Sequence, residues 1–189
     1  DKDGFFINIY NIYNFLLVII CSGLTFMDKP LAKLLFAKDF YSAWKYAPFL
    51  MISTIFSGMA AFLGGILSAL KKSGLFAKSS VITAIVNTIL NVILVFLIGP
   101  LGAAISTAFA YFLMWAIRLN QIKKCINLRV NIVRDLTAYI ILVIQAVLLL
   151  VIQRDSVFCW YQLIFVLITL LLYMKELKSV FMKFVSKIK

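Results

Sequence analysis

The sequence predicts an all-α, polytopic membrane protein built as a bundle of six transmembrane helices, and three observations lead to this fold class. Hydrophobic residues make up 64% of the 189 residues and charged residues only 14%, whereas a soluble domain carries about 45–50% apolar and about 25% charged residues. The mean hydropathy is +1.05. Long runs without any charged residue separate short segments that contain the charges. A water-soluble fold cannot hide so much apolar surface, so lipid must surround most of it.

The uncharged runs define the predicted spans, because a helix needs about 20 apolar residues to cross a hydrocarbon core of about 30 Å. The run from Ser79 to Ile117 is nearly twice that long. Gly99 and Pro100 lie near its middle and predict a turn between two helices, since proline lacks an N–H group and glycine ends helices. Lipid offers no hydrogen-bond partner, so each run must be helical. The six expected spans cover about residues 4–27, 46–70, 79–98, 101–117, 136–153 and 156–174.

Lysine and arginine fall unevenly on the two sides of this arrangement. Alternate connecting segments carry 14 cations on one side and 5 on the other. The positive-inside rule therefore places both ends of the chain in the cytoplasm. The net charge of +12 follows the flanks of the spans, so we expect no nucleic-acid partner. The sequence begins with Asp1, and we expect it to be the tail of a longer polypeptide.

The predicted organisation is a transmembrane lobe over residues 1–174 and a basic amphipathic cytoplasmic tail over residues 175–189. In the tail, apolar residues recur at helical spacing between lysines, as in helices that lie on anionic lipid. Residues 28–45 also read as amphipathic. Membrane lipid is therefore an expected partner at both places.

The span over residues 46–70 carries small residues at every fourth position. Small residues let two membrane helices approach closely, so we expect this helix to lie inside the bundle. A leucine at Gly65 is expected to force two helices apart. The stripe consists of Ser53, Ser57, Ala61, Gly65 and Ala69.

Polar residues near the start of the first span form a candidate substrate cavity. Amide side chains bind sugar hydroxyls and aromatic rings stack on sugar rings, so this face suits the mouth of a cavity that accepts sugars. The same residues also suit an interface belt, in which tyrosines lie at the level of the lipid headgroups. The candidates are Asn8, Asn11, Asn14, Tyr10 and Tyr13.

A second pair of amides, Asn87 and Asn91, lies one helical turn apart in the third span. An amide in hydrocarbon needs a partner. The pair could face the substrate, or it could join helices through Ser106 or Thr107 of the next span.

The predicted spans contain no charged residue well inside them, so this chain shows no proton or ion relay. There is no histidine, and the three cysteines have no metal-ligand spacing. No nucleophile with its base, phosphate loop or carboxylate pair is present. We therefore expect no enzyme, no bound metal and no cofactor.

The stretch "APFLMISTIFSGMAAFLGGILSALKKSG", followed by "NTILNVILVFLIGPLGAAISTAFAYFLM", resembles the carboxy-terminal half of polysaccharide flippases in the multidrug/oligosaccharidyl-lipid/polysaccharide exporter superfamily. The segment "KPLAKLLFAKDFYSAWKYAPFL" also fits, although Ala37 stands where a glycine is common. The resemblance implies one lobe of a two-lobe transporter, whose partner is an amino-terminal six-helix lobe absent from this sequence. It further implies a polyprenyl-diphosphate-linked oligosaccharide as the substrate, which crosses the membrane by alternating access.

Such cavities usually hold cations that attract the diphosphate. The resemblance therefore makes candidates for headgroup entry of the cations at the cytoplasmic ends of the helices, although they could serve only to set the topology. These candidates are Lys71, Lys72, Arg118, Lys123 and Lys124.

The expected function is thus a flippase for surface polysaccharide, such as O-antigen or capsule, in the bacterial inner membrane. The alternatives are a cation-coupled drug exporter or a peptidoglycan-precursor flippase of the same fold, or a membrane scaffold for polysaccharide assembly that does not transport.

Overall fold

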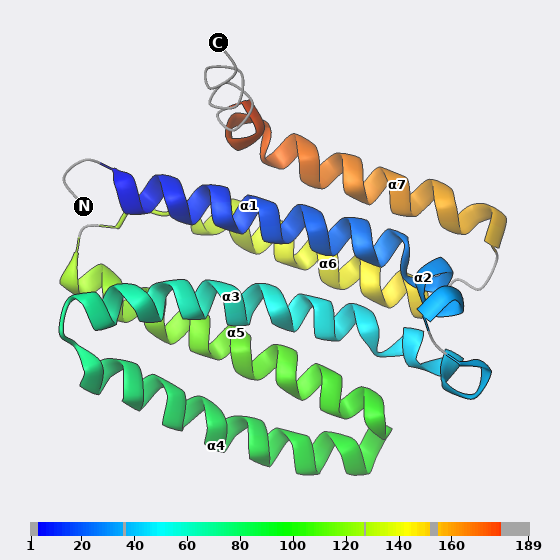
Figure 1. Cartoon of the computed structure of the whole chain (residues 1–189), viewed down its shortest axis with the longest axis horizontal. Coiled ribbons are helices and arrows are strands. Elements are labelled where there is room, and N and C mark those ends of the chain that lie inside the picture. The colour runs from blue at the N-terminus through cyan, green and yellow to red at the C-terminus, as the bar shows by residue number, and fades with distance from the viewer. Residues whose placement is uncertain (1–3, 36, 127, 152–154, 179–189) are drawn as a thin grey trace.

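The computed structural model describes residues 4–35, 37–126, 128–151 and 155–178, and every element in these ranges is a helix (Figure 1). The elements, in chain order, are α1 (Phe5–Phe26), α2 (Asp28–Leu35), the 3-10 helix η1 (Lys38–Lys45), α3 (Ala47–Ala69), α4 (Ser73–Ile98), α5 (Pro100–Cys125), α6 (Ile132–Val151) and α7 (Asp155–Leu172). The predicted all-α fold class is confirmed.

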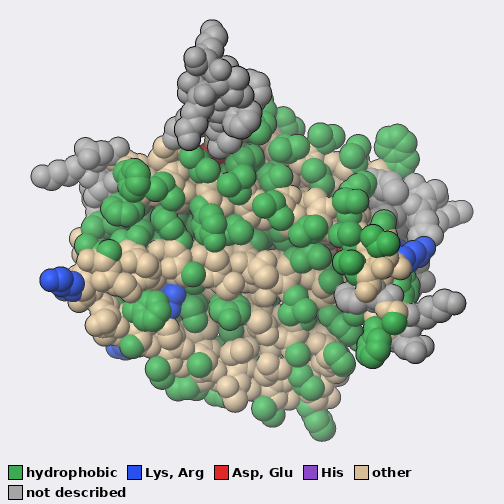
Figure 2. Space-filling model, viewed as in Figure 1, with side chains coloured by type: hydrophobic (Ala, Val, Ile, Leu, Met, Phe, Trp, Pro, Cys, Tyr) green, Lys and Arg blue, Asp and Glu red, His purple; other side chains and the backbone are tan. Residues whose placement is uncertain are grey.

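Five described helices, α1, α3, α4, α5 and α6, are long and apolar enough to cross a membrane. The sixth predicted span coincides with α7, whose described apolar stretch, Trp160–Leu172, is shorter. Figure 2 shows hydrophobic side chains over much of one face, with lysine and arginine mainly near its two ends. The chain is therefore a multi-pass membrane protein.

Helix α3 lies at the centre of the bundle and packs against α1, α4, α5 and α6. Helix α4 lies at the edge, where it packs mainly on α5 and exposes large apolar side chains such as Val92 and Phe96. Helices α1, α6 and α7 pack together on the other side of α3 (Figure 1). The start of α1, the α3–α4 turn and the α5–α6 connection all lie at the left end of the bundle in that view. We call this the network end.

The predicted turn between the third and fourth spans is confirmed. Gly99 has a positive φ of 66°, a conformation that glycine adopts without a steric penalty. Pro100 begins α5, where a missing N–H is tolerated. A Cβ atom on Gly102 would overlap the carbonyl group of Leu94, so glycine is required where α4 and α5 meet.

The interior position of α3 is confirmed, but the expectation for its small-residue stripe is wrong. Its buried face carries Met59, Ala60, Leu63 and Leu67. A Cβ atom on Gly65 would meet nothing within 4 Å, and the stripe positions Ala61 and Ala69 are exposed as well. Residues four positions apart share a face, and it is the neighbouring row, with Ala60 and Gly64, that packs inside the bundle.

The connection between α1 and α3 is helical, in α2 and η1, as its amphipathic pattern predicts. The Lys29 Nζ atom lies 5.3 Å from the centre of the Trp44 ring. Asp28 is only 3% exposed, and its Oδ2 atom has no hydrogen-bond partner among the described residues. Most of the predicted tail, from residue 179 onward, lies outside the described residues.

Candidate functional site

A network of polar side chains crosses the network end of the bundle and joins α1, α6 and the segment after α7. Hydropathy alone gives no reason to expect it, because its members are far apart in the sequence. Hydrogen bonds link Asn11, Asn14, Arg134, Asp135, Tyr139, Tyr173 and Glu176.

Asn14 is the centre of the buried half of this network. Its Nδ2 atom donates to the hydroxyl of Tyr173 at 3.0 Å, and its Oδ1 atom accepts from the hydroxyl of Tyr139 at 2.8 Å. Asn14 and Tyr173 are fully buried. An amide in an apolar interior is tolerated when its hydrogen bonds are satisfied, so Asn14 connects three helical segments.

Arg134 is the centre of the more exposed half. Its Nη2 atom donates to Asn11 Oδ1 at 2.8 Å and to Asp135 Oδ1 at 2.9 Å. Its Nη1 atom donates to Glu176, and its guanidinium lies 4.6 Å from the centre of the Tyr173 ring. One cation therefore binds two carboxylates, an amide and an aromatic face.

Asp135 is fully buried in the first turn of α6. Its Oδ1 atom accepts from Arg134 and, at 3.2 Å, from the hydroxyl of Tyr173. Its Oδ2 atom is buried without a hydrogen-bond partner among the described residues. The predicted spans contain no charge well inside them, but the folded bundle buries this carboxylate. Asp135 directly precedes the predicted span, but α6 begins three residues before it, at Ile132.

Aromatic rings separate this network from the apolar interior. The Trp115 indole N–H donates to the hydroxyl of Tyr10 at 3.2 Å. The Tyr139 ring packs edge-on against Phe56, with ring centres 4.8 Å apart, and against Trp115 at 5.5 Å. Edge-to-face pairs of this kind are favourable, and they fix the orientation of the tyrosines in the network.

The five cavity candidates of α1 differ in burial and in contacts. Asn11, Asn14 and Tyr10 are held by the contacts just described. Tyr13 is half-buried against Phe62, with ring centres 6.1 Å apart. Asn8 is exposed and stands apart from the network.

Arg118, predicted to lie at the membrane surface, is only 3% exposed. Its guanidinium donates to the Ala60 carbonyl at 2.6 Å, to Ser79 Oγ at 3.0 Å and to Ser80 Oγ at 2.9 Å. It also lies 4.4 Å from the centre of the Phe76 ring. Arg118 thus joins α3, α4 and α5 from inside the bundle. The other headgroup candidates, Lys71, Lys72, Lys123 and Lys124, are exposed.

Among the described residues, no hydrogen bond joins the asparagines of α4 to another helix, so the contacts do not support the interhelical alternative. The Oδ1 atom of Asn87 is buried without a partner among the described residues. Ser106 and Thr107 donate to the carbonyl of Ala103 in their own helix instead. Asn91 is half-buried.

A second buried polar group lies between α1, α6 and α7, and the sequence analysis missed it. Ser22 donates to Gln145 Oε1 at 3.0 Å, and Gln145 Nε2 donates to Gln162 Oε1 at 2.6 Å. All three residues are fully buried. Two predicted spans each contain one of these glutamines. This could have indicated the contact, because a buried amide in a membrane helix needs a partner on another helix.

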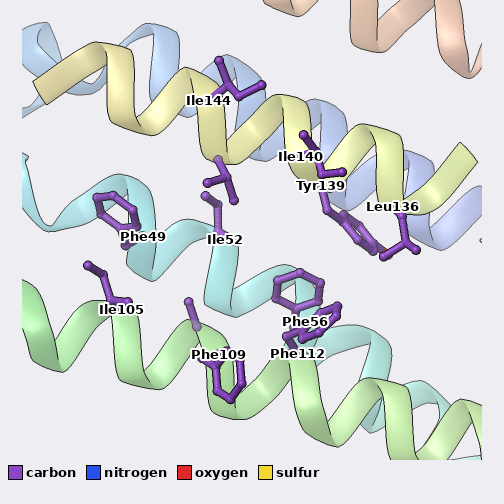
Figure 3. A pocket seen from close by; sticks show the side chains of 12 residues that line it. Phe49, Ile52, Phe56, Ile105, Phe109, Phe112, Leu136, Tyr139, Ile140 and Ile144 are labelled. Atoms are coloured by element: carbon purple, nitrogen blue, oxygen red, sulfur yellow. The ribbon is translucent and has the colours of Figure 1, made fainter. Parts of the chain in front are cut away.

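An apolar cavity of about 390 Å³ lies between α3, α5 and α6. Figure 3 shows its lining side chains, among them Phe49, Phe56, Phe109 and Tyr139. A smaller cavity of about 290 Å³ lies between α5 and α6 and includes Asn120 and Lys123. No group of three or more histidine, cysteine or acidic residues suited to a metal ion occurs among the residues that the structure describes.

Comparison with known proteins relates the chain to a glycan flippase. It is 28% identical over 107 residues to the "Probable low-salt glycan biosynthesis flippase Agl15" of Haloferax volcanii. The aligned stretch covers 57% of this chain and 23% of that protein. No family model matches the chain, and no solved structure matches it. The similarity indicates a flippase-like membrane protein.

Proposed function

We propose that this chain is part of a flippase that moves a lipid-linked glycan across a membrane. The observation that carries the proposal is the similarity over 107 residues to a protein named as a glycan biosynthesis flippase. The fold supports it, because the chain is a bundle with five described helices of membrane-spanning length. A transporter accounts for these features better than an enzyme does.

The proposed substrate is a polyprenyl-diphosphate-linked oligosaccharide destined for a surface polysaccharide such as O-antigen or capsule. The chain acts as the carboxy-terminal lobe, with both ends in the cytoplasm. The aligned stretch covers less than a quarter of the relative, which leaves room there for a second lobe. Transporters built from two repeats bind their substrates between the repeats and open alternately to each side. The relative comes from an archaeon and does not support a bacterial location. The bacterial inner membrane is therefore proposed from the sequence resemblance alone.

The polar network gives the candidate residues distinct roles in this proposal. Asn11 and Asn14 fix α1 against α6, and Asn8 remains available to a glycan at the mouth of the cavity. Among the cations, Arg118 holds three helices together, and the exposed lysines attract the diphosphate. This division follows from burial, since only an exposed cation can bind a phosphate that arrives from the membrane surface.

A cation-coupled exporter is a second candidate, and Asp135 favours it. A carboxylate with one buried oxygen unpaired can take up a proton, and intramembrane acids often belong to such relays. Asp135→Asn in the complete transporter is then expected to abolish transport driven by a pH gradient while substrate binding persists. Unchanged gradient-driven transport by this variant would exclude Asp135 from coupling.

The proposed function is tested in a cell that lacks its own polysaccharide flippase. The chain is expressed alone and joined to the amino-terminal half of a related flippase, and surface glycan is measured per amount of protein in the membrane. We expect the joined protein to restore glycan and the isolated chain to insert without restoring it. Restoration by the isolated chain would contradict the half-transporter model, and failure of a correctly inserted joined protein would contradict the flippase assignment.

A further inference from the structure

The two cavities between α5 and α6 are adjoining parts of one groove. Phe112 and Leu136 line both of them. The larger part has α3 as its floor, with Ile52 and Phe56 between the other two helices (Figure 3). The smaller part continues along α5 toward the network end.

The groove is almost as long as a bilayer core is thick. It follows α5 from Ile105 to Lys123, which lies 18 positions later. At a rise of about 1.5 Å per residue this distance is about 27 Å, against about 30 Å for the hydrocarbon core of a bilayer. An occupant of the whole groove must therefore cross nearly both leaflets.

The chemistry of the groove changes along its length. From Ile105 to Phe112, its walls are aliphatic and aromatic side chains. Tyr139 presents its ring, because its hydroxyl donates to Asn14. Polar side chains enter the lining only at the other end, where Asn120 and the exposed Lys123 lie. The groove is thus apolar over most of its length and cationic at one end.

We propose that this groove binds the prenyl chain of the lipid carrier, with the carrier's phosphate at Lys123. Charge complementarity requires an anionic headgroup at the lysine end. Length selects the chain, because the acyl chains of a phospholipid reach only about half of the hydrocarbon core, or about 15 Å. A long polyprenyl chain fills the remaining apolar part. This inference rests on the proposed function, since it assigns a binding site to the lipid part of that substrate.

The site is tested by photolabelling of the purified chain in lipid nanodiscs. The probe is a long polyprenyl phosphate that carries a diazirine at the end remote from the phosphate. The comparison probe is phosphatidylglycerol with a diazirine at the end of one acyl chain. We expect the prenyl probe to label residues around Ile105 and Ile144, and unlabelled phosphatidylglycerol not to displace it.

Two variants test the two ends of the groove, each against a matched control. Ala108→Trp places an indole ring in the apolar part and is expected to lower prenyl labelling by at least about tenfold, since the ring blocks the path of the chain along the groove. Ala84→Trp, on the exposed face of α4, is expected to leave labelling unchanged. Lys123→Gln is expected to lower labelling by about fivefold, the effect of one basic residue on an anionic lipid. Lys78→Gln, at an exposed position of α4 and outside the groove lining, is the control for charge.

Three results would overturn the groove site. The first is equal labelling of the Ala108→Trp and Ala84→Trp variants, both checked for helix content. The second is full displacement of the prenyl probe by phosphatidylglycerol. The third is crosslinking of the groove to a second polypeptide in place of the probe. Failure of this site and failure of the proposed function give different results. If the joined protein with Ala108→Trp restores surface glycan, the groove site fails and the flippase assignment stands. If the groove takes the prenyl label but the joined protein restores no glycan, the flippase assignment fails and the groove site stands.

Discussion

Asn14 and Tyr173 lie 159 positions apart, yet Asn14 donates a hydrogen bond of 3.0 Å to the tyrosine hydroxyl. The same hydroxyl donates to Asp135, so one oxygen connects α1 to α6 and to the segment after α7. Because each of these groups is buried, losing one partner leaves the others unsatisfied.

Tyr173→Phe removes that hydroxyl and keeps the ring. We expect the free energy of unfolding to fall by about 1–3 kcal/mol, because a buried amide and a buried carboxylate each lose a partner. Tyr111→Phe is the control, since the half-buried Tyr111 makes no hydrogen bond to any described residue. The measurement is unfolding in detergent, and equal stability of the two variants would show that the network is not closed through Tyr173.

Gly64 and Gly65 are adjacent but differ in their surroundings. A Cβ atom on Gly64 would lie 2.7 Å from Arg118 Nη1 and 2.8 Å from the Phe76 ring, whereas one on Gly65 meets nothing within 4 Å. We expect Gly64→Ala to destabilise the bundle by about 1–3 kcal/mol, the range for overpacking. Gly65→Ala is expected to be neutral or slightly stabilising, because alanine favours the helix. The reverse order of thermal stabilities would contradict this packing of α3.

Arg118→Lys keeps the charge and loses the planar group that bonds three partners at once. A lysine ammonium cannot reproduce that fork. We expect stability to fall by about 1–3 kcal/mol, the penalty for losing buried hydrogen bonds. Arg129→Lys, at an exposed position, should change little. Thermal unfolding of both variants checks the prediction, and an unaffected Arg118→Lys protein would mean that the contacts with Ala60, Ser79 and Ser80 contribute little.

Burial raises the pKa of Asp28 to about 7, although the neighbouring Lys29 lowers it. The protonated carboxyl is therefore favoured in the folded state, and its stabilising contribution is complete below the unfolded-state pKa of about 4. That contribution is lost as the pH rises from about 4 to about 7. We expect the wild-type chain to lose about 3–4 kcal/mol of stability over this interval, and Asp28→Asn to remove most of the dependence. A pH profile of unfolding that is identical in both proteins would contradict the burial of this carboxyl.

The fold class could be predicted because hydropathy alone determines it. A run of apolar residues long enough to cross lipid has only one way to satisfy its backbone, so the all-α bundle follows from the sequence. The turn at Gly99 and Pro100 was predictable for a similar reason, since it depends on the properties of the two residues themselves.

The polar network does not follow from the sequence, because charged residues normally mark the ends of spans. Arg118 and Asp135 each lie one position outside a predicted span, but the helices extend past them, and both side chains turn into the bundle. Their partners are set by the arrangement of helices, which a charge-free run does not reveal. The buried face of α3 is hidden in the sequence for the same reason. The row with Gly65 and the row with Gly64 both consist of small residues, and they differ only in which helices pack against them.

The most direct measurement is transbilayer movement of a fluorescent polyprenyl-diphosphate-linked oligosaccharide in proteoliposomes. The complete transporter that contains this chain is compared with the isolated chain, and the fraction of label reached by an external quencher is followed with time. We expect the complete transporter to move the label between leaflets, and the isolated chain to match empty liposomes because one lobe cannot close a cavity. No movement by a folded, correctly inserted complete transporter would contradict the assignment to glycan flipping.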